Sequence, residues 1–120
     1  LYINDGAYGS LFDAAHVGWR FPVKLLRSAE SRAKPMEFQL YGPTCDDLDH
    51  MKGPFLLPAD VGAGDYIEIG MLGAYGAAMR TQFNGFGSGE TVIVTDEPMA
   101  SVYTGEHAIV VDRTNVVAIR

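Results

Sequence analysis

The sequence has one cysteine, one tryptophan and no long apolar run, and each shortage excludes a class of structure. With Cys45 alone, no disulfide can form within the chain, which favours a reducing, cytoplasmic location. The longest stretch without a charged residue covers residues 69–79, only eleven residues, whereas a membrane-spanning helix needs about 18 or more. The first residues lack the basic and apolar segments of a secretory signal. We therefore expect a cytoplasmic chain without a transmembrane helix.

Positive charge is also scarce, since nine Lys and Arg stand against fifteen Asp and Glu and give a net charge of −6. This sign argues against nucleic acid and anionic membrane as partners and favours a cationic small molecule. The three histidines, His16, His50 and His107, show no ligand spacing to one another or to Cys45. We therefore expect no metal site.

The pattern of apolar residues indicates one domain built of strands. Short runs of β-branched and aromatic residues, bounded by Gly, Pro or Asp, cover residues 1–4, 21–26, 36–41, 65–69, 91–95, 108–111 and 116–119. The last two runs are compatible with a terminal hairpin. Only residues 71–79 could form a short helix, which Gly73 and Gly76 would weaken. We predict an all-β domain, an antiparallel barrel or sandwich of about seven or more short strands.

The most informative stretch is Tyr-Gly-Pro-Thr-Cys-Asp-Asp-Leu-Asp at residues 41–49. Gly42 and Pro43 end the preceding strand, so Cys45 lies in a turn, where an exposed thiol can exchange a proton. Neighbouring carboxylates disfavour a negatively charged thiolate and favour a thiol that donates its proton. Composition alone favours a different reading, in which Cys45 is a small buried apolar residue. Asp47 and Asp49 are interpreted as loop solvation and turn capping.

Four segments occur in an order and spacing that resemble a known family. They are Asn-Asp-Gly-Ala-Tyr-Gly-Ser at 4–10, Tyr-Gly-Pro-Thr-Cys-Asp at 41–46, Leu-Gly-Ala-Tyr at 72–75 and Phe-Asn-Gly-Phe at 83–86. Together they resemble the C-terminal domain of the ornithine decarboxylase family, which are pyridoxal-phosphate-dependent enzymes with an alanine racemase-like fold. The resemblance covers residues 1–98, and nothing beyond residue 98 matches.

The resemblance implies that residues 1–120 are a single C-terminal β domain and lack the N-terminal barrel of the TIM type. In the family, that barrel binds pyridoxal 5'-phosphate through a lysine, and the C-terminal domain completes an active site shared across a homodimer. The three lysines here, Lys24, Lys34 and Lys52, lie outside the four segments. The isolated chain is therefore expected to be inactive.

The resemblance also assigns roles to individual residues. Cys45 is similar to the family cysteine that helps to protonate the reacting carbon after carbon dioxide departs. Asp46 resembles the carboxylate that receives the distal ammonium of the substrate through a charge-assisted hydrogen bond. Tyr75 resembles the tyrosine that contacts the cofactor phosphate, and Phe83 matches the segment packed near it. Asp13 is the candidate for a second carboxylate at the distal end of the substrate.

These roles predict an amino-acid decarboxylase that converts ornithine to putrescine and carbon dioxide in polyamine biosynthesis. Relatives that act on diaminopimelate tend to place Glu after the cysteine, so Asp46 favours ornithine or lysine. A non-catalytic regulatory homologue of the same family is the main alternative, although the joint presence of Cys45, Asp46 and Tyr75 argues against it. A free-standing small barrel that binds a cationic ligand is a third possibility, which rests only on the acidic composition.

Overall fold

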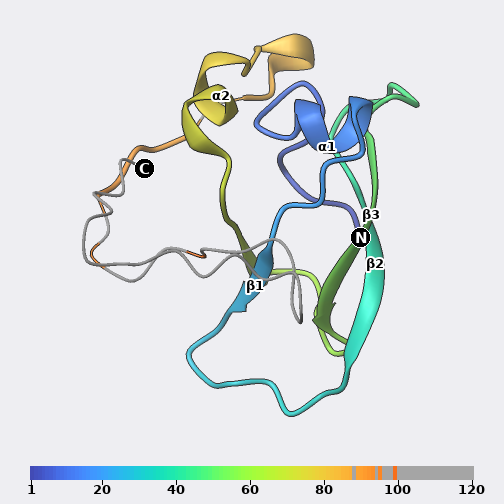
Figure 1. The fold of residues 1–120 in the computed structure, drawn as a ribbon, viewed down its shortest axis with the longest axis vertical. Helices are drawn as coiled ribbons and strands as arrows, with labels where there is room; N and C mark the ends of the chain where they lie inside the picture. Colours follow the sequence, from blue (N-terminus) through green and yellow to red (C-terminus); the bar gives the residue numbers. More distant parts are fainter. Residues whose placement is uncertain (88, 94, 96–98, 100–120) are drawn as a thin grey trace.

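Two antiparallel strand pairs form the framework of the computed structural model, which describes residues 1–87, 89–93, 95 and 99. The elements are α1 (Phe12–His16), β1 (Val23–Leu26), β2 (Pro35–Tyr41), β3 (His50–Pro58), β4 (Tyr66–Ile69), α2 (Gly73–Ala78) and a 3-10 helix (Phe83–Gly85). Strand β1 pairs with β4, and β2 pairs with β3. The helices gather beyond one end of the strands, at the top of Figure 1.

The core lies between β2, β3 and α1. In β2 the apolar residues alternate with polar ones, and Leu40 is fully buried; Met51 and Phe55 of β3 are buried with it. Helix α1 packs against β3 and adds Ala14, with Leu11 just before it. Because this cluster joins the sheet to the first helix, it fixes the end of the molecule where the chain turns from β2 into β3.

The β2–β3 pair contains an irregularity that a glycine permits. Phe38 pairs with Phe55 and Leu40 pairs with Met51, so the register shifts between them. Gly53 lies within this shift at φ +67, in the left-handed region that favours glycine. A Cβ atom there would stand 2.9 Å from the Phe38 carbonyl oxygen. The bulge therefore needs Gly53.

Several expected elements are confirmed. The runs at 21–26, 36–41 and 65–69 correspond to β1, β2 and β4, and the weak helix at 71–79 corresponds to α2. Three elements were not expected: β3, α1 and the 3-10 helix. Strand β3 was missed because the Gly-Pro pair at 53–54 is typical of a turn, and α1 was missed because five residues are too few to show helical periodicity.

Other expectations are corrected. Residues 1–4 make only one parallel bridge, Tyr2 to Tyr41, and residues 91–93 and 95 form no strand. The predicted hairpin at 108–119 lies outside the described residues. The described part of the chain has four strands in two separate pairs, with neither a closed barrel nor seven strands among its elements. It also holds no helix long and apolar enough to cross a membrane.

An exposed ion cluster joins the loop after β1 to the turn before β4. Arg27 donates two hydrogen bonds to Asp65, Nε to Oδ1 at 2.8 Å and Nη2 to Oδ2 at 2.6 Å. It also pairs with Asp60 at 2.9 Å, and Ser31 Oγ donates to the same carboxylate. The bonds from Arg27 lower the pKa of Asp65 to about 2.

We expect Arg27→Met to destabilise the chain at neutral pH and to do so progressively less in acid. A carboxyl group whose pKa is depressed on folding adds stability above its ordinary pKa, and this contribution is lost as the pH falls through the folded value. The difference from wild type in the free energy of unfolding should therefore shrink between pH 4 and pH 2. Urea unfolding at several pH values measures it. Arg32→Met, an exposed change in the same loop, is the control, and an equal deficit at pH 2 and pH 7 would contradict the expectation.

Candidate functional site

The β2–β3 loop is anchored by a buried carboxylate. Asp49 is only 3% exposed, and its two oxygens accept hydrogen bonds from backbone N–H groups of different segments. Oδ1 accepts from Ala7 at 2.7 Å, and Oδ2 accepts from Thr44 at 3.0 Å. The Gly42 N–H donates to the Asp49 carbonyl at 2.9 Å, which closes the loop. Asp49 thus ties residues 42–49 to the N-terminal segment.

Two glycines make room for this carboxylate. A Cβ atom on Gly6 or on Gly42 would collide with the side chain of Asp49. Both backbones can therefore approach Asp49 only because neither residue carries a side chain. The Asp-Gly pair at 5–6 and the Gly-Pro pair at 42–43 are turn signals in the sequence. In the structure their glycines also lie directly against the buried Asp49 side chain.

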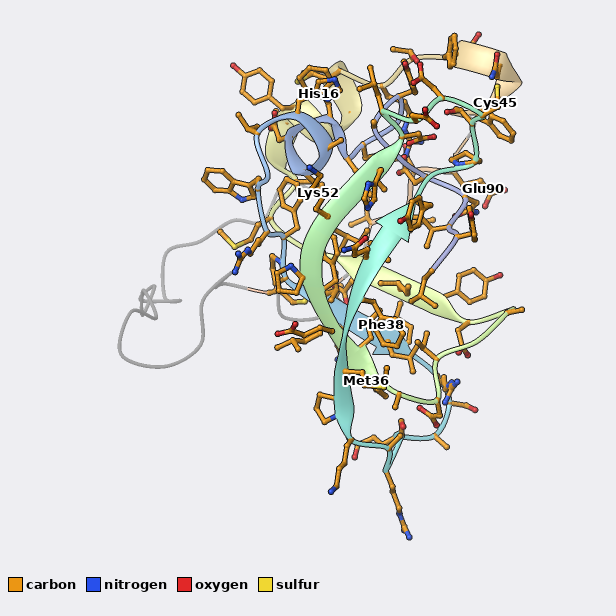
Figure 2. All side chains as sticks on the ribbon, turned by 90° about the vertical axis from the view of Figure 1, so that its right-hand side faces the viewer. His16, Met36, Phe38, Cys45, Lys52 and Glu90 are labelled. Carbon is orange, nitrogen blue, oxygen red and sulfur yellow. The ribbon has the colours of Figure 1, made fainter. Side chains whose placement is uncertain are left out.

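Cys45 lies exposed on this anchored loop, next to the 3-10 helix. Asn84 Nδ2 donates to the Cys45 Sγ atom over 3.8 Å. Asn84 adopts the left-handed conformation at φ 54, which asparagine tolerates better than most residues. Figure 2 shows Cys45 beside this helix and at the opposite end of the molecule from Met36. The exposed position removes the reading of Cys45 as a buried apolar residue.

Asp46, the next residue, has both carboxylate oxygens engaged. Tyr8 Oη donates to Oδ2 at 2.5 Å, and the Leu48 N–H donates to Oδ1 at 2.9 Å. The bond from Tyr8, followed by that from Leu48, holds the pKa of Asp46 below its ordinary value. The same contact with Asp46 raises the pKa of the Tyr8 phenol. At neutral pH Asp46 is therefore an anion and Tyr8 carries its proton.

Tyr8 also holds the segment that carries Phe83. The two rings stack with centroids 4.3 Å apart. The Tyr8 carbonyl accepts two hydrogen bonds from Thr81, one from the backbone N–H and one from Oγ1, each 2.9 Å long. Arg80 adds bonds to Asp5 at 3.0 Å and to the hydroxyl of the nearby serine, residue 10. Three segments, 5–10, 42–49 and 80–86, therefore meet at one site.

The structure brings together some of the residues expected from the sequence. Cys45 and Asp46 lie in segment 42–49 and Phe83 lies in segment 80–86, two of the three segments that meet. Tyr75 lies on α2 with 70% of its surface exposed, and Asp13 is half-buried in the first turn of α1. Among the described residues, the hydrogen bonds and ring contacts that join the three segments include neither Tyr75 nor Asp13.

Sequence reasoning missed two residues of the site, Tyr8 and Asp49. Tyr8 lies in the segment at 4–10, but the resemblance to the family assigned no role to it. Asp49 was interpreted as loop solvation and turn capping; it does cap backbone N–H groups, but it is buried rather than solvated. The glycines at 6 and 42 were the available signal, because close approach of two backbones to one side chain requires both.

The described site holds no lysine. Lys24 lies on β1, Lys34 precedes β2, and Lys52 lies on β3, apart from Cys45 in Figure 2. The three lysines therefore lie outside the segments that meet at the site. These segments bring together an exposed thiol, the exposed ring of Phe83 and a carboxylate held by two hydrogen bonds.

Comparisons with known proteins agree with this arrangement. The family model described as "Pyridoxal-dependent decarboxylase, C-terminal sheet domain" matches residues 1–73. Ornithine decarboxylase of Mus musculus is 38% identical over 106 residues, covering 82% of this chain and 21% of that protein. Antizyme inhibitor 2 of Xenopus laevis is 39% identical over 90 residues, covering 71% and 18%.

A solved structure shares the fold. The lysine/ornithine decarboxylase of Vibrio vulnificus, complexed with cadaverine, aligns with a TM-score of 0.61 and 30% identity, covering 79% of this chain and 25% of that one. The chain spans about a quarter of the length of the first curated relatives that it matches. These matches confirm the resemblance drawn from the four segments: the chain belongs to the family of pyridoxal-dependent decarboxylases and corresponds to their C-terminal sheet domain.

Proposed function

We propose that this chain is the C-terminal domain of a pyridoxal-phosphate-dependent ornithine decarboxylase and contributes Cys45 and Asp46 to the active site. The observation that carries the proposal is the pairing of an exposed thiol with a fixed anionic carboxylate on one anchored loop. A thiol can supply a proton, and a carboxylate can hold an ammonium group. An amino acid with a distal ammonium group needs both when it loses carbon dioxide and gains a proton.

The cofactor would be held mainly by an N-terminal barrel that carries the Schiff-base lysine. When bound, pyridoxal phosphate supplies the electron sink that makes loss of the carboxyl group possible. On this chain, Tyr75 would contact the phosphate through its exposed hydroxyl, and Phe83 would pack nearby. Asp13 would lie at the distal end of the substrate. We further infer a homodimer, in which this domain completes the site of the partner subunit, and a cytoplasmic location.

Cys45 would act as the proton donor at the reacting carbon. Its thiol is exposed, and the side chain on its Sγ atom, Asn84, is a neutral amide rather than a cation. Asp46 and Asp47 follow it directly in the chain. A thiol at this exposed position can deliver its proton to a bound substrate.

Asp46 would bind the distal ammonium of the substrate. Its carboxylate is ionised at neutral pH, and within the described part of the chain each oxygen accepts one hydrogen bond. A carboxylate oxygen has room for two, so each can still accept one from an ammonium group. This contact selects diamino acids over neutral amino acids, with ornithine as the first choice and lysine as the second.

A regulatory binding protein of the same family is the second candidate function. The observation that favours it is the match to antizyme inhibitor 2, whose identity to this chain is as high as that of ornithine decarboxylase. The two candidates differ in what they demand of Cys45. A binding protein has no chemical use for an exposed thiol beside an ionised carboxylate.

Carbon dioxide release tests the proposal. The longer parent protein, loaded with pyridoxal phosphate, should release it from ornithine, more slowly from lysine and least from diaminopimelate. The 120-residue chain alone is the control and should release none. Preference for diaminopimelate would overturn the assignment of ornithine as the substrate. If none of the three amino acids released carbon dioxide, the decarboxylase proposal would fail and the regulatory candidate would remain.

We expect Asp46→Asn in the parent enzyme to raise the KM for ornithine roughly ten- to a hundredfold, because one charge-assisted hydrogen bond is lost. The value of kcat should change much less, since the side chain contacts the distal end of the substrate. Steady-state kinetics measure both. Asp47→Asn, which alters an exposed neighbour, is the matched control. A wild-type KM in Asp46→Asn would contradict the assignment.

A further inference from the structure

Tyr8 lies in segment 5–10 and contacts both of the other segments of the site. Its hydroxyl donates to Asp46, its ring stacks on Phe83, and its carbonyl accepts both hydrogen bonds from Thr81. Its neighbour Ala7 donates to the buried Asp49, which fixes the backbone on the other side. The position of the Tyr8 ring is therefore set from two sides, independently of the hydroxyl.

This rigidity gives the hydroxyl a definite effect on Asp46. A carboxylate on a loop can rotate about its Cβ–Cγ bond, and in water the orientations differ little in energy. Tyr8 Oη holds Oδ2 at 2.5 Å while the Leu48 N–H holds Oδ1 at 2.9 Å. Two donors on opposite oxygens leave one favoured orientation of the carboxylate plane. The remaining lone pairs then point in fixed directions.

We propose that Tyr8 is a positioning residue, which fixes the direction of the Asp46 carboxylate and thereby the length of diamino acid that the site accepts. The inference rests on the proposed function, in which Asp46 binds the distal ammonium. An acceptor fixed in place matches one chain length between the reacting carbon and the ammonium. A rotating acceptor accommodates ornithine and lysine more equally.

Tyr8→Phe in the parent enzyme tests this role, because it removes the hydroxyl and keeps the stacked ring. We expect the KM for ornithine to rise about tenfold, with kcat within about twofold of wild type, in keeping with the loss of one hydrogen bond to a charged group. The preference for ornithine over lysine, as a ratio of kcat/KM, should fall at least several-fold. Tyr66→Phe, which changes an exposed tyrosine on β4, is the control. Unchanged KM and unchanged preference would overturn the inference.

A second readout separates this inference from the proposed function. In the full 120-residue chain with ¹³C-labelled aspartate carboxyl groups, NMR titration should show the pKa of Asp46 rising toward its ordinary value in Tyr8→Phe and staying low in Tyr66→Phe. An unchanged titration overturns the positioning role even if the parent is an active decarboxylase. A parent that releases no carbon dioxide defeats the proposed function, while the titration still decides whether Tyr8 positions Asp46.

Discussion

Cys45→Ala in the parent decarboxylase is expected to lower kcat for ornithine about a hundredfold or more, because a positioned proton donor contributes roughly 10²- to 10⁴-fold to a proton-transfer step. Cys45 is exposed, so removal of its Sγ atom leaves no buried cavity and costs little stability. The loss should fall on turnover rather than on cofactor binding. It should also misdirect protonation, so that the expected diamine is a smaller share of the product.

Three measurements separate these effects: kcat, the ratio of products, and the absorption band of the bound cofactor. Cys45→Ser is a graded variant, since a hydroxyl has the same geometry but gives up its proton less readily. Leu48→Ala is the matched control, because Leu48 is exposed on the same loop and donates to Asp46 from its backbone N–H, which the substitution keeps. A Cys45→Ala enzyme with wild-type kcat and product ratio would remove Cys45 from the chemistry.

Local patterns predicted the strands that carry the site better than they predicted the site itself. The run at 36–41 alternates apolar and polar residues and ends at Gly42, and β2 ends at Tyr41 accordingly. The same reasoning did not predict β3, because Gly53 is typical of a turn. In the structure Gly53 lies inside a bulge, and the partner strand of that bulge lies some fifteen residues earlier in the chain. A bulge is defined by two strands together, so neither strand alone reveals it.

The contacts of the site were also only partly predictable from local sequence patterns. Cys45 and Asp46 are adjacent in the sequence, and their motif identifies them. Tyr8 lies 38 residues from Asp46, and only the folded chain brings its hydroxyl to that carboxylate. The burial of Asp49 likewise depends on two glycines, Gly6 and Gly42, from different segments. Contacts of this range follow from tertiary packing, which periodicity and turn signals do not encode.

Asp49→Ala is expected to lower the free energy of unfolding of the chain by about 3 kcal/mol or more. Hydrogen bonds to a charged group contribute about 1.5–3 kcal/mol each, and Asp49 accepts two. The variant leaves the N–H groups of Ala7 and Thr44 without this acceptor. Urea unfolding followed through the fluorescence of Trp19, the single tryptophan, measures the loss. Asp49→Asn should lose less, because its amide oxygen can still accept one of the two bonds.

Asp47→Ala supplies the control, since Asp47 is exposed two residues away and should change stability by no more than about 0.5 kcal/mol. Equal stability of Asp47→Ala and Asp49→Ala would contradict the anchoring role. The three acidic residues of this loop should therefore separate by phenotype. Asp49 determines whether the loop is held in place, Asp46 determines how tightly the substrate binds, and Asp47 affects neither. Because all three carry the same side chain, burial and hydrogen-bond partners alone must account for the difference.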